Sequence, residues 1–368
     1  MSDVFTIADD LGPDKVIHIH KPRAGLRAIL VVDNVAAGPA IGGARMAPDV
    51  TMEECARLAR AMTLKNAAAG LPHGGGKSVI MADPAMAEGQ KEELVRAFAR
   101  AIGQITDYIV GPDMGTNERC MGWAHDEIGR AVGLPREIGG IPLDEIGATG
   151  FGVAVSAQAA EGFCSFNLDG ARVAVQGFGA VGHHAARFLA ERGARLVAAS
   201  DSRGCISDPG GLDIAELAAI KQQGGSVTDL GSGTTAPRDA VIETDCDILV
   251  PAARPDVIHE GNAARVKAGL ILEGANIPTT TGAEESLQQR GVVVVPDFIA
   301  NAGGVICASV EYHGGSEQQA FAAIEEKIRR NTFEVLARAR SEQSTPRLAS
   351  TALALERVRV AQSLRRFR

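Results

Sequence analysis

Two lysines and an aspartate are the residues of this sequence best suited to acid–base chemistry. Lys65 and Lys77 bracket the glycine-rich segment LKNAAAGLPHGGGKS, and Asp113 lies in the turn GPDMGTN. We expect the glycines to form a turn that brings the two lysines into one cleft, where each charge and partial burial lower the pKa of the other amine. One lysine would then be a general base and the other would hold an anion, with the Asp113 carboxylate beside them.

The end of this segment, GGGKS, also resembles a phosphate-binding P-loop. That motif needs a glycine six positions before its lysine, which is Leu71 here, and it follows a strand. Gly70 is one residue too early and the preceding pattern is helical, so we reject the P-loop. The alternative is that both lysines are solvated surface residues and Asp113 an ordinary turn residue. We expect His73, in the same loop, to face water.

A second glycine pattern predicts a dinucleotide site. In VAVQGFGAVGHHAARFL, the GxGxxG fingerprint has the flanking elements that it requires, an apolar strand before it and a helix after it. The glycines permit the tight turn, the approach of a pyrophosphate and close helix–strand packing, while the helix N-terminus supplies N–H donors. The residues we assign to this turn are Gly177, Gly179, Ala180, Val181 and Gly182.

The next predicted strand ends in Asp201, about 20 residues beyond the fingerprint. A carboxylate there accepts a hydrogen bond from the ribose 2′-hydroxyl and repels a 2′-phosphate, so we expect NAD as the cofactor. Ser202 and Arg203 stand next to it and leave NADP possible.

The elements that must position these residues predict an α/β fold of two domains. Strand and helix patterns in 1–138 indicate a catalytic and oligomerisation domain. From Arg172 onward apolar strands alternate with helices, which predicts a doubly wound, parallel Rossmann sheet within 139–320. The segment 321–368 predicts helices without strands, and we expect these to pack back on the first domain.

Local signals in the first region are specific. Alternating β-branched residues around the turn PRAG predict paired strands, and Thr51 before Glu53 and Glu54 predicts the start of a helix. Gly70 is placed to end that helix.

Composition excludes several classes of function. The formal net charge of −8 gives no electrostatic reason to bind nucleic acid. No apolar run reaches the roughly 18 residues of a membrane span. The acidic N-terminal segment lacks the apolar stretch of a secretory signal. Six scattered cysteines without CxxC spacing indicate reduced thiols and no metal site, so we expect a cytoplasmic protein.

Seven segments resemble the glutamate/leucine/phenylalanine/valine dehydrogenase family. They occur in the family's order over about residues 38–310: GPAIGGARM, MTLKNAAAGLPHGGGKSVI, GPDMGTN, ATGFGV, VQGFGAVG, EGANIPTT and VPDFIANAGGV. The resemblance implies a homo-oligomeric enzyme that reversibly deaminates an L-amino acid to its 2-oxo acid and ammonia, with a nicotinamide cofactor.

The resemblance also implies individual roles. Lys65 is similar to the lysine that binds the substrate α-carboxylate, and Lys77 to the lysine that activates water. Asp113 is similar to the carboxylate that moves a proton to and from the substrate amine. The residues that resemble cofactor contacts are Thr149, Asn301 and Asn276, the last of which lies beside both cofactor and substrate.

Two positions bear on the choice of amino acid. Enzymes of the glutamate branch carry a lysine before the paired glycines of GGxR and a serine three residues after the valine of NAGGV. Ile41 and Ala308 stand at these places. Burying a carboxylate against them without a partner would cost several kcal/mol. We therefore expect leucine, valine, isoleucine or phenylalanine as substrate, in a pocket lined by Ile41, Gly111, Val305 and Ala308.

Two alternatives stay open. The segments from VAASDSRG to NAGGV are closer to the glutamate branch, so glutamate remains possible with a carboxylate partner elsewhere. A catalytically inactive, nucleotide-binding regulator is the other alternative, but it would be expected to lack Lys65, Lys77 or Asp113, and all three are present.

Overall fold

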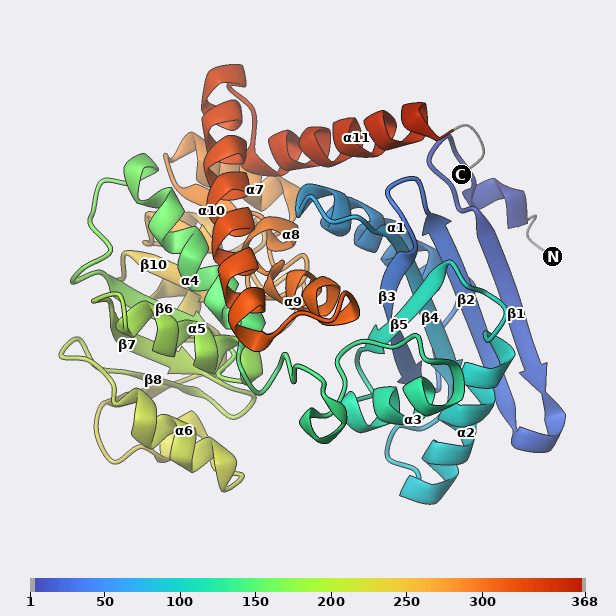
Figure 1. Cartoon of the computed structure of the whole chain (residues 1–368). Helices are drawn as coiled ribbons and strands as arrows, with labels where there is room; N and C mark the ends of the chain where they lie inside the picture. The colour runs from blue at the N-terminus through green and yellow to red at the C-terminus, as the bar shows by residue number, and fades with distance from the viewer. Residues whose placement is uncertain (1–3, 366–368) are drawn as a thin grey trace. The chain divides into compact units, whose positions relative to one another are not determined.

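The computed structural model describes residues 4–365, so residues 1–3 and 366–368 of the expected first and last segments lie outside the described residues. Contacts divide the chain into two compact, discontinuous units (Figure 1). Unit 1 comprises Met1–Leu143, Val305–Ala320 and Leu353–Arg368, and unit 2 comprises Asp144–Gly304 and Phe321–Ala352. These boundaries differ from the sequence-based ones because the chain returns to unit 1 twice after residue 304.

Unit 1 is built on a five-stranded mixed sheet of order β1-β2-β4-β3-β5. The strands are β1 (Lys15–Lys21), β2 (Leu26–Asn34), β3 (Ala40–Ala47), β4 (Gly74–Met81) and β5 (Tyr108–Pro112). β1, β2 and β4 pair antiparallel, whereas β3 runs parallel to both β4 and β5. The predicted hairpin is confirmed, with Gly25 at φ 64° in the turn between β1 and β2.

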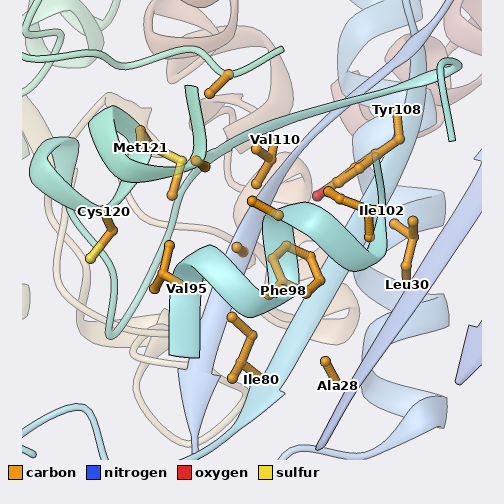
Figure 2. Packing of buried hydrophobic residues seen from close by; sticks show 14 of the residues in the cluster. Ala28, Leu30, Ile80, Val95, Phe98, Ile102, Tyr108, Val110, Cys120 and Met121 are labelled. Atoms are coloured by element: carbon orange, nitrogen blue, oxygen red, sulfur yellow. The ribbon is translucent and has the colours of Figure 1, made fainter. Parts of the chain in front are cut away.

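Helices cover both faces of this sheet: α1 (Met52–Ala68) on one, α2 (Glu88–Ala101) and α3 (Glu118–Ile128) on the other. Alternation along β2 divides the core, because Ile29 and Val31 pack towards α1 while Leu30 packs towards α2. Figure 2 shows Phe98 of α2 in the second of these cores, together with Leu30 and Ile80 of the sheet.

The predicted ends of α1 are confirmed. The Thr51 side chain accepts a hydrogen bond from the backbone N–H of Glu54, and Gly70 has a φ of 63° after the last turn. This fixes Lys65 in the last turn of α1, nine residues before β4 begins.

Unit 2 contains a seven-stranded sheet of order β12-β11-β10-β6-β7-β8-β9. Its strands are β6 (Arg172–Gln176), β7 (Arg195–Ser200), β8 (Cys205–Ser207), β9 (Thr234–Ala236), β10 (Ile248–Pro251), β11 (Leu270–Leu272) and β12 (Val293–Val295). β12, β11, β10, β6 and β7 are parallel, as predicted for a Rossmann sheet. The antiparallel extension formed by β8 and β9 was not predicted.

The strand order reverses between β6 and β10, and ligands of such sheets bind at the carboxyl ends of the strands beside this point. The remaining α-helices are α4 (Ala148–Ala160), α5 (Ala180–Ala190), α6 (Ile214–Gln222), α7 (Thr281–Gln289), α8 (Asp297–Ala300), α9 (Gly303–Tyr312), α10 (Glu317–Glu342) and α11 (Pro346–Leu364). The 3-10 helices are η1 (Val4–Ile7), η2 (Pro22–Ala24), η3 (Arg136–Ile138), η4 (Glu161–Phe163), η5 (Val227–Asp229), η6 (Arg238–Glu243) and η7 (Ala263–Arg265).

Within residues 4–365, no helix combines the length and apolar character needed to cross a membrane. The helices predicted after residue 320 are present as the last part of α10 and all of α11.

Candidate active site

The centre of the site in unit 1 is a buried ion pair between Lys77 and Asp113. The Lys77 Nζ contacts Asp113 Oδ2, and the two side chains are 7% and 12% exposed. Lys77 lies within β4, and Asp113 directly follows β5. Because β4 and β5 flank β3 in the sheet, the pair forms between strands that are not direct neighbours.

Glycines permit this arrangement by close packing. A Cβ on Gly43 of β3 would lie 2.8 Å from the Asp113 Cβ, and one on Gly76 would lie 2.9 Å from the Tyr108 ring. A Cβ on Gly75 would lie 2.0 Å from the backbone nitrogen of Thr63 in α1. The expected glycine turn before Lys77 is therefore wrong: these glycines belong to β4, because only residues without side chains fit between α1 and β5 there.

The environment of Lys77 favours its neutral form. Burial lowers the pKa of Lys77 from 10.5 to about 7, and the charges of Arg45 and Lys65 act in the same direction. The Asp113 carboxylate acts in the opposite direction, because an anion in contact favours the ammonium form. The neutral amine of Lys77 is therefore accessible near neutral pH.

Arg45 of β3 is a charged residue of the site that the sequence reasoning missed. Its Nη2 lies 3.4 Å from Asp113 Oδ1, and its Nη1 lies 2.6 Å from Glu54 Oε1. The available signal was the period of the strand: Arg45 stands two residues after Gly43 and so points to the same face of β3. This second cation contacts Asp113 and acts to lower the pKa of its partner, Lys77.

Further bonds fix the Asp113 turn. The Asp113 backbone N–H donates to Thr116 Oγ1 at 3.0 Å, and the Thr116 hydroxyl donates to the Ala44 carbonyl at 2.8 Å. The Met114 N–H donates to Asp113 Oδ1 at 2.6 Å. The turn is thus tied to β3, and the carboxylate keeps Oδ2 for Lys77.

Lys65 lies in the last turn of α1 and is half-buried, and its charge acts to lower the pKa of Lys77. Its neighbour Asn66 is fully buried and donates to the carbonyls of Ile41 (3.3 Å) and Gly74 (2.7 Å). α1 is therefore fixed to β3 and β4 at the same level of the sheet as the expected substrate pocket.

An apolar cluster lies at this level of unit 1. Ile41, Ile109, Val132 and Ala308 form one buried group, with Tyr312 packed against it. Gly111 borders the group, since a Cβ there would lie 3.3 Å from Val132. Of the expected pocket residues, the structure brings Ile41, Gly111 and Ala308 together, and half-buried Val305 lies three residues before Ala308 on α9.

Glu311 places α9 in unit 1. Its carboxylate accepts the backbone N–H groups of Gly133 (2.7 Å) and Leu134 (2.9 Å). Sequence reasoning missed this residue, because nothing in a local pattern pairs a helical glutamate with backbone about 178 residues away. The contact sets Ala308 beside Ile41.

The expectation that His73 faces water is wrong. His73 is 1% exposed, and burial lowers its pKa to about 4. Its ring contacts Tyr312 edge-on at 5.8 Å between centroids, and its Nδ1 lies 3.1 Å from the Pro39 carbonyl oxygen. Pro72 of the same loop is exposed, whereas His73 directly precedes β4 and is covered by Tyr312 and His313.

In unit 2, the fingerprint forms the turn between β6 and α5. Gly177 has a φ of 92°, and a Cβ on it would lie 2.5 Å from the Ala253 Cβ after β10. A Cβ on Gly182 would lie 2.0 Å from the Gly177 carbonyl oxygen, whereas one on Gly179 would meet nothing within 4 Å. The turn therefore keeps open space in front of the α5 N-terminus, at Ala180 and Val181, where a pyrophosphate fits.

Asp201 directly follows β7, as predicted, but both of its oxygens have partners. Oδ1 accepts from the Arg203 N–H (2.9 Å) and the Ser226 hydroxyl (3.0 Å). Oδ2 accepts from Lys221 Nζ (2.8 Å) and the Val227 N–H (3.0 Å). Burial acts to raise the pKa of Asp201, but these bonds outweigh it and lower the pKa to about 2.

The three expected nicotinamide-side residues also lie in unit 2. Asn301 donates from Nδ2 to Asn276 Oδ1 at 3.2 Å, and its own Oδ1 is buried without a partner among the described residues. Thr149 belongs to the first turn of α4, where a Cβ on Gly303 would lie 3.1 Å from the Thr149 Cα. The unpartnered Asn301 oxygen fits the N–H donors of a carboxamide.

Comparison with known proteins identifies the family. The profile described as "Glutamate/Leucine/Phenylalanine/Valine dehydrogenase" matches residues 139–366, and that described as "Glu/Leu/Phe/Val dehydrogenase, dimerisation domain" matches residues 13–130. A glutamate dehydrogenase of Aeropyrum pernix is 42% identical over 356 residues, which cover 90% of this chain and 85% of that protein. Other relatives carry the names NADP-specific (Saccharolobus shibatae) and NAD-specific (Staphylococcus aureus) glutamate dehydrogenase, each 40% identical.

Solved structures agree on the fold. The hetero-hexameric glutamate dehydrogenase of Thermus thermophilus in its Leu-bound form superposes with a TM-score of 0.86 at 31% identity, over 96% of this chain and 90% of that one. The L-tryptophan dehydrogenase of Nostoc punctiforme has a TM-score of 0.76 at 26% identity, over 98% and 99%. The chain therefore belongs to the glutamate/leucine/phenylalanine/valine dehydrogenase family and is an amino acid dehydrogenase.

Proposed function

We propose that the chain catalyses the reversible, NAD-dependent oxidative deamination of an apolar L-amino acid of the leucine, valine, isoleucine or phenylalanine class. The observation that carries the choice of substrate is the buried cluster around Ile41 and Ala308. A substrate carboxylate placed there would lose water without gaining a cation, which costs several kcal/mol. An aliphatic or phenyl side chain makes no hydrogen bonds to water, so its burial in the cluster carries no such cost.

The polar end of the substrate would meet the charged residues of unit 1. Lys65 is proposed to hold the α-carboxylate, since it lies in the last turn of α1, is half-buried, and is close enough to Lys77 for its charge to lower the Lys77 pKa. Asp113 would accept a proton from the substrate ammonium group, because only the neutral amine can assist departure of the Cα hydride. The bound cofactor supplies the hydride acceptor.

Lys77 is proposed to act on the imine that hydride loss leaves. With a pKa of about 7, its neutral amine can take a proton from water while the oxygen bonds to the imine carbon. Return of a proton to nitrogen through Asp113 lets the carbinolamine collapse, with cleavage of the C–N bond and release of ammonia. The sum is amino acid, water and oxidised cofactor giving 2-oxo acid, ammonium, reduced cofactor and one proton.

The proposal of NAD rests on Asp201. Its carboxylate stays ionised at neutral pH and lies at the end of β7, where it opposes a 2′-phosphate. NADP is the second candidate, because the Lys221 ammonium at 2.8 Å offsets that charge and the exposed Arg203 stands in the same turn. The ratio of kcat/KM for the two cofactors tests the choice.

Glutamate is the second candidate substrate, favoured by the names of the relatives. A catalytically inactive regulator is disfavoured, because Lys77 and Asp113 are both present and in contact. We also propose that the protein is a homo-oligomer; the Thermus relative is named as a hetero-hexamer, which supports oligomeric assembly. Turnover with Leu, Val, Ile, Phe and Glu, followed by absorbance of the reduced cofactor, tests the substrate proposal.

A further inference from the structure

A cluster of three buried carboxylates around the half-buried Arg347 lies at the start of α11 in unit 2. Arg347 donates from Nε to Glu284 Oε1 (2.5 Å), from Nη1 to Asp297 Oδ1 (2.9 Å) and from Nη2 to Glu273 Oε2 (2.5 Å). The three carboxylate side chains are 4%, 9% and 0% exposed, respectively. One guanidinium, on a side chain that is 21% exposed, therefore binds three carboxylates that are largely removed from water.

Each carboxylate comes from a different element. Glu273 follows β11, Glu284 belongs to α7 and Asp297 begins α8. They stand 74, 63 and 50 residues before Arg347, so the fold brings this common partner to them. Neither the proton transfers proposed above nor the predicted dinucleotide turn uses any of these four residues.

The charge balance of the cluster requires Arg347. Burial raises the pKa of Glu273 well above its usual range, the Arg347 charge opposes this, and the neighbouring Asp297 and Glu284 add to it. Without the guanidinium, three carboxylates would share a dry site with no cation among the residues bonded to them. Repulsion among the carboxylates would then move them apart or favour their protonation.

The cluster also fixes the loop of residues 274–277. Asp297 Oδ2 accepts the backbone N–H of Ile277 at 2.9 Å, and Glu273 Oε2 accepts the backbone N–H of Asp297 at 2.9 Å. Ile277 has a φ of 49°, a left-handed conformation that a β-branched residue adopts only when its surroundings hold it. The bond to Asp297 holds its N–H, and its carbonyl accepts the Asp256 N–H at 3.0 Å.

The same loop carries the expected nicotinamide contacts. Asn301 Nδ2 lies 3.3 Å from the carbonyl oxygens of both Gly274 and Ala275, and 3.2 Å from Asn276 Oδ1. The loop follows β11, on the opposite side of β6 from β7 and Asp201. A dinucleotide across the carboxyl ends of this sheet places its adenosine half towards β7 and its nicotinamide half towards β10 and β11.

We propose that Arg347 is a positioning residue for the cofactor: through Asp297 and Glu273 it holds residues 274–277 so that Asn276 and Asn301 meet the nicotinamide half. The inference rests on the proposed use of a nicotinamide cofactor and not on the choice of amino acid. Arg347 itself contacts neither cofactor nor substrate in this scheme.

The test compares whole-cofactor binding with binding of its adenosine half. Dissociation constants are measured by calorimetry for NADH and ADP, or for NADPH and 2′,5′-ADP if the wild type binds NADPH more tightly. Arg347→Lys keeps the charge but cannot bond three carboxylates in one plane. We expect it to raise the Kd of the reduced cofactor about tenfold, equivalent to about 1.4 kcal/mol, while the Kd of the adenosine fragment changes less than about twofold.

Asp297→Asn is the second variant, since it keeps the shape of the side chain and gives the same expectation if Arg347→Lys does not fold. Arg330→Lys is the matched control, because Arg330 is exposed on α10. It should alter the Kd of neither the reduced cofactor nor the adenosine fragment. Unchanged binding of the reduced cofactor in both variants, or equal weakening of both ligands, would show a purely structural cluster and overturn the inference. A wild type that binds the cofactor but deaminates no apolar amino acid would contradict the proposed function alone.

Discussion

Asp113 meets Lys77 over Gly43, a residue of the strand that separates them in the sheet. The Asp113 Cβ lies 2.8 Å from where a Cβ of Gly43 would stand, and its carboxylate contacts the Lys77 amine. The acid–base pair therefore depends on a position without a side chain in β3. The GGAR segment therefore contributes to the site in two ways: Gly43 leaves room for the Asp113 side chain, and Arg45 adds a positive charge.

Gly43→Ala tests this dependence. The added Cβ would also lie 2.6 Å from the Pro112 carbonyl oxygen, so β5 must move. We expect turnover to fall by at least about tenfold and the free energy of unfolding to fall by about 2 kcal/mol. Gly89→Ala in α2 is the control, because a Cβ there meets nothing within 4 Å and a helical alanine should be neutral or stabilising. Equal behaviour of the two variants in kinetics and denaturation would refute the packing argument.

Lys77→Ala removes the proposed general base. We expect kcat for deamination to fall by about 10²- to 10⁴-fold, while the Kd of the reduced cofactor stays within about twofold, because the cofactor residues belong to unit 2. Steady-state kinetics and calorimetry measure the two quantities. Lys21→Ala, at an exposed position of β1, controls for loss of a lysine. Near-normal turnover by Lys77→Ala would remove Lys77 from the mechanism.

The pH profile gives an independent check of Lys77. Its pKa in the folded protein is about 7, below the ordinary 10.5, so the neutral base accumulates as pH rises through about 7. We expect kcat/KM to rise about tenfold per pH unit below this value and to level off above it.

Arg45→Gln should shift this profile. Removing a cation that disfavours the charged lysine raises the Lys77 pKa, so the rising limb should move to higher pH by about one unit. The measurement is kcat/KM against pH for both proteins. A limb that stays in place, or moves to lower pH, would contradict the proposed influence of Arg45 on Lys77.

The substrate pocket is tested by reversing its polarity. Ile41→Lys with Ala308→Ser places a cation and a hydroxyl beside each other in the cluster, so glutamate gains partners and leucine loses apolar contact. We expect the ratio of kcat/KM for glutamate to that for leucine to rise by about 10²-fold. Ile41→Met keeps the pocket apolar and is the control. No rise in the ratio would mean that the side chain binds elsewhere.

The ionised Asp201 carboxylate is expected to stabilise the folded protein. Its pKa is lowered to about 2 in the folded protein, so its contribution to stability is present above the unfolded value of 3.8 and is lost as pH falls through about 2. The difference corresponds to about 2 kcal/mol, which Asp201→Asn should remove at neutral pH. Chemical denaturation at pH 7 and at low pH measures this. Equal unfolding free energies of the two proteins at pH 7 would contradict it.

The sequence predicted the chemistry-bearing residues more fully than their surroundings. Sequence motifs pointed to Lys77, Asp113 and the turn at Gly177. Asp113 and Gly177 each directly follow a predicted strand, and Lys77 directly follows a run of glycines. It could not place the glycines before Lys77 in a strand, since a run of glycines carries no periodicity. Contacts over long separations, such as Glu311 with Gly133, follow from tertiary packing and leave no local signal.

Asp201 shows the same limit. A position after the second Rossmann strand predicts a ribose contact, but the four donors that meet this carboxylate come from elements up to 26 residues away. The buried cluster around Arg347 was equally unpredictable, because its four members are dispersed between residues 273 and 347. Charge in the sequence reveals neither burial nor partner.

The measurement that tests the central claim most directly is turnover of the purified protein with L-leucine, L-valine, L-isoleucine, L-phenylalanine and L-glutamate, each with NAD and with NADP. The account predicts reduction of NAD with one or more of the four apolar amino acids and kcat/KM for glutamate at least about 10²-fold lower. Turnover of glutamate alone would contradict it and would require a cation for the side-chain carboxylate in place of the cluster around Ile41 and Ala308.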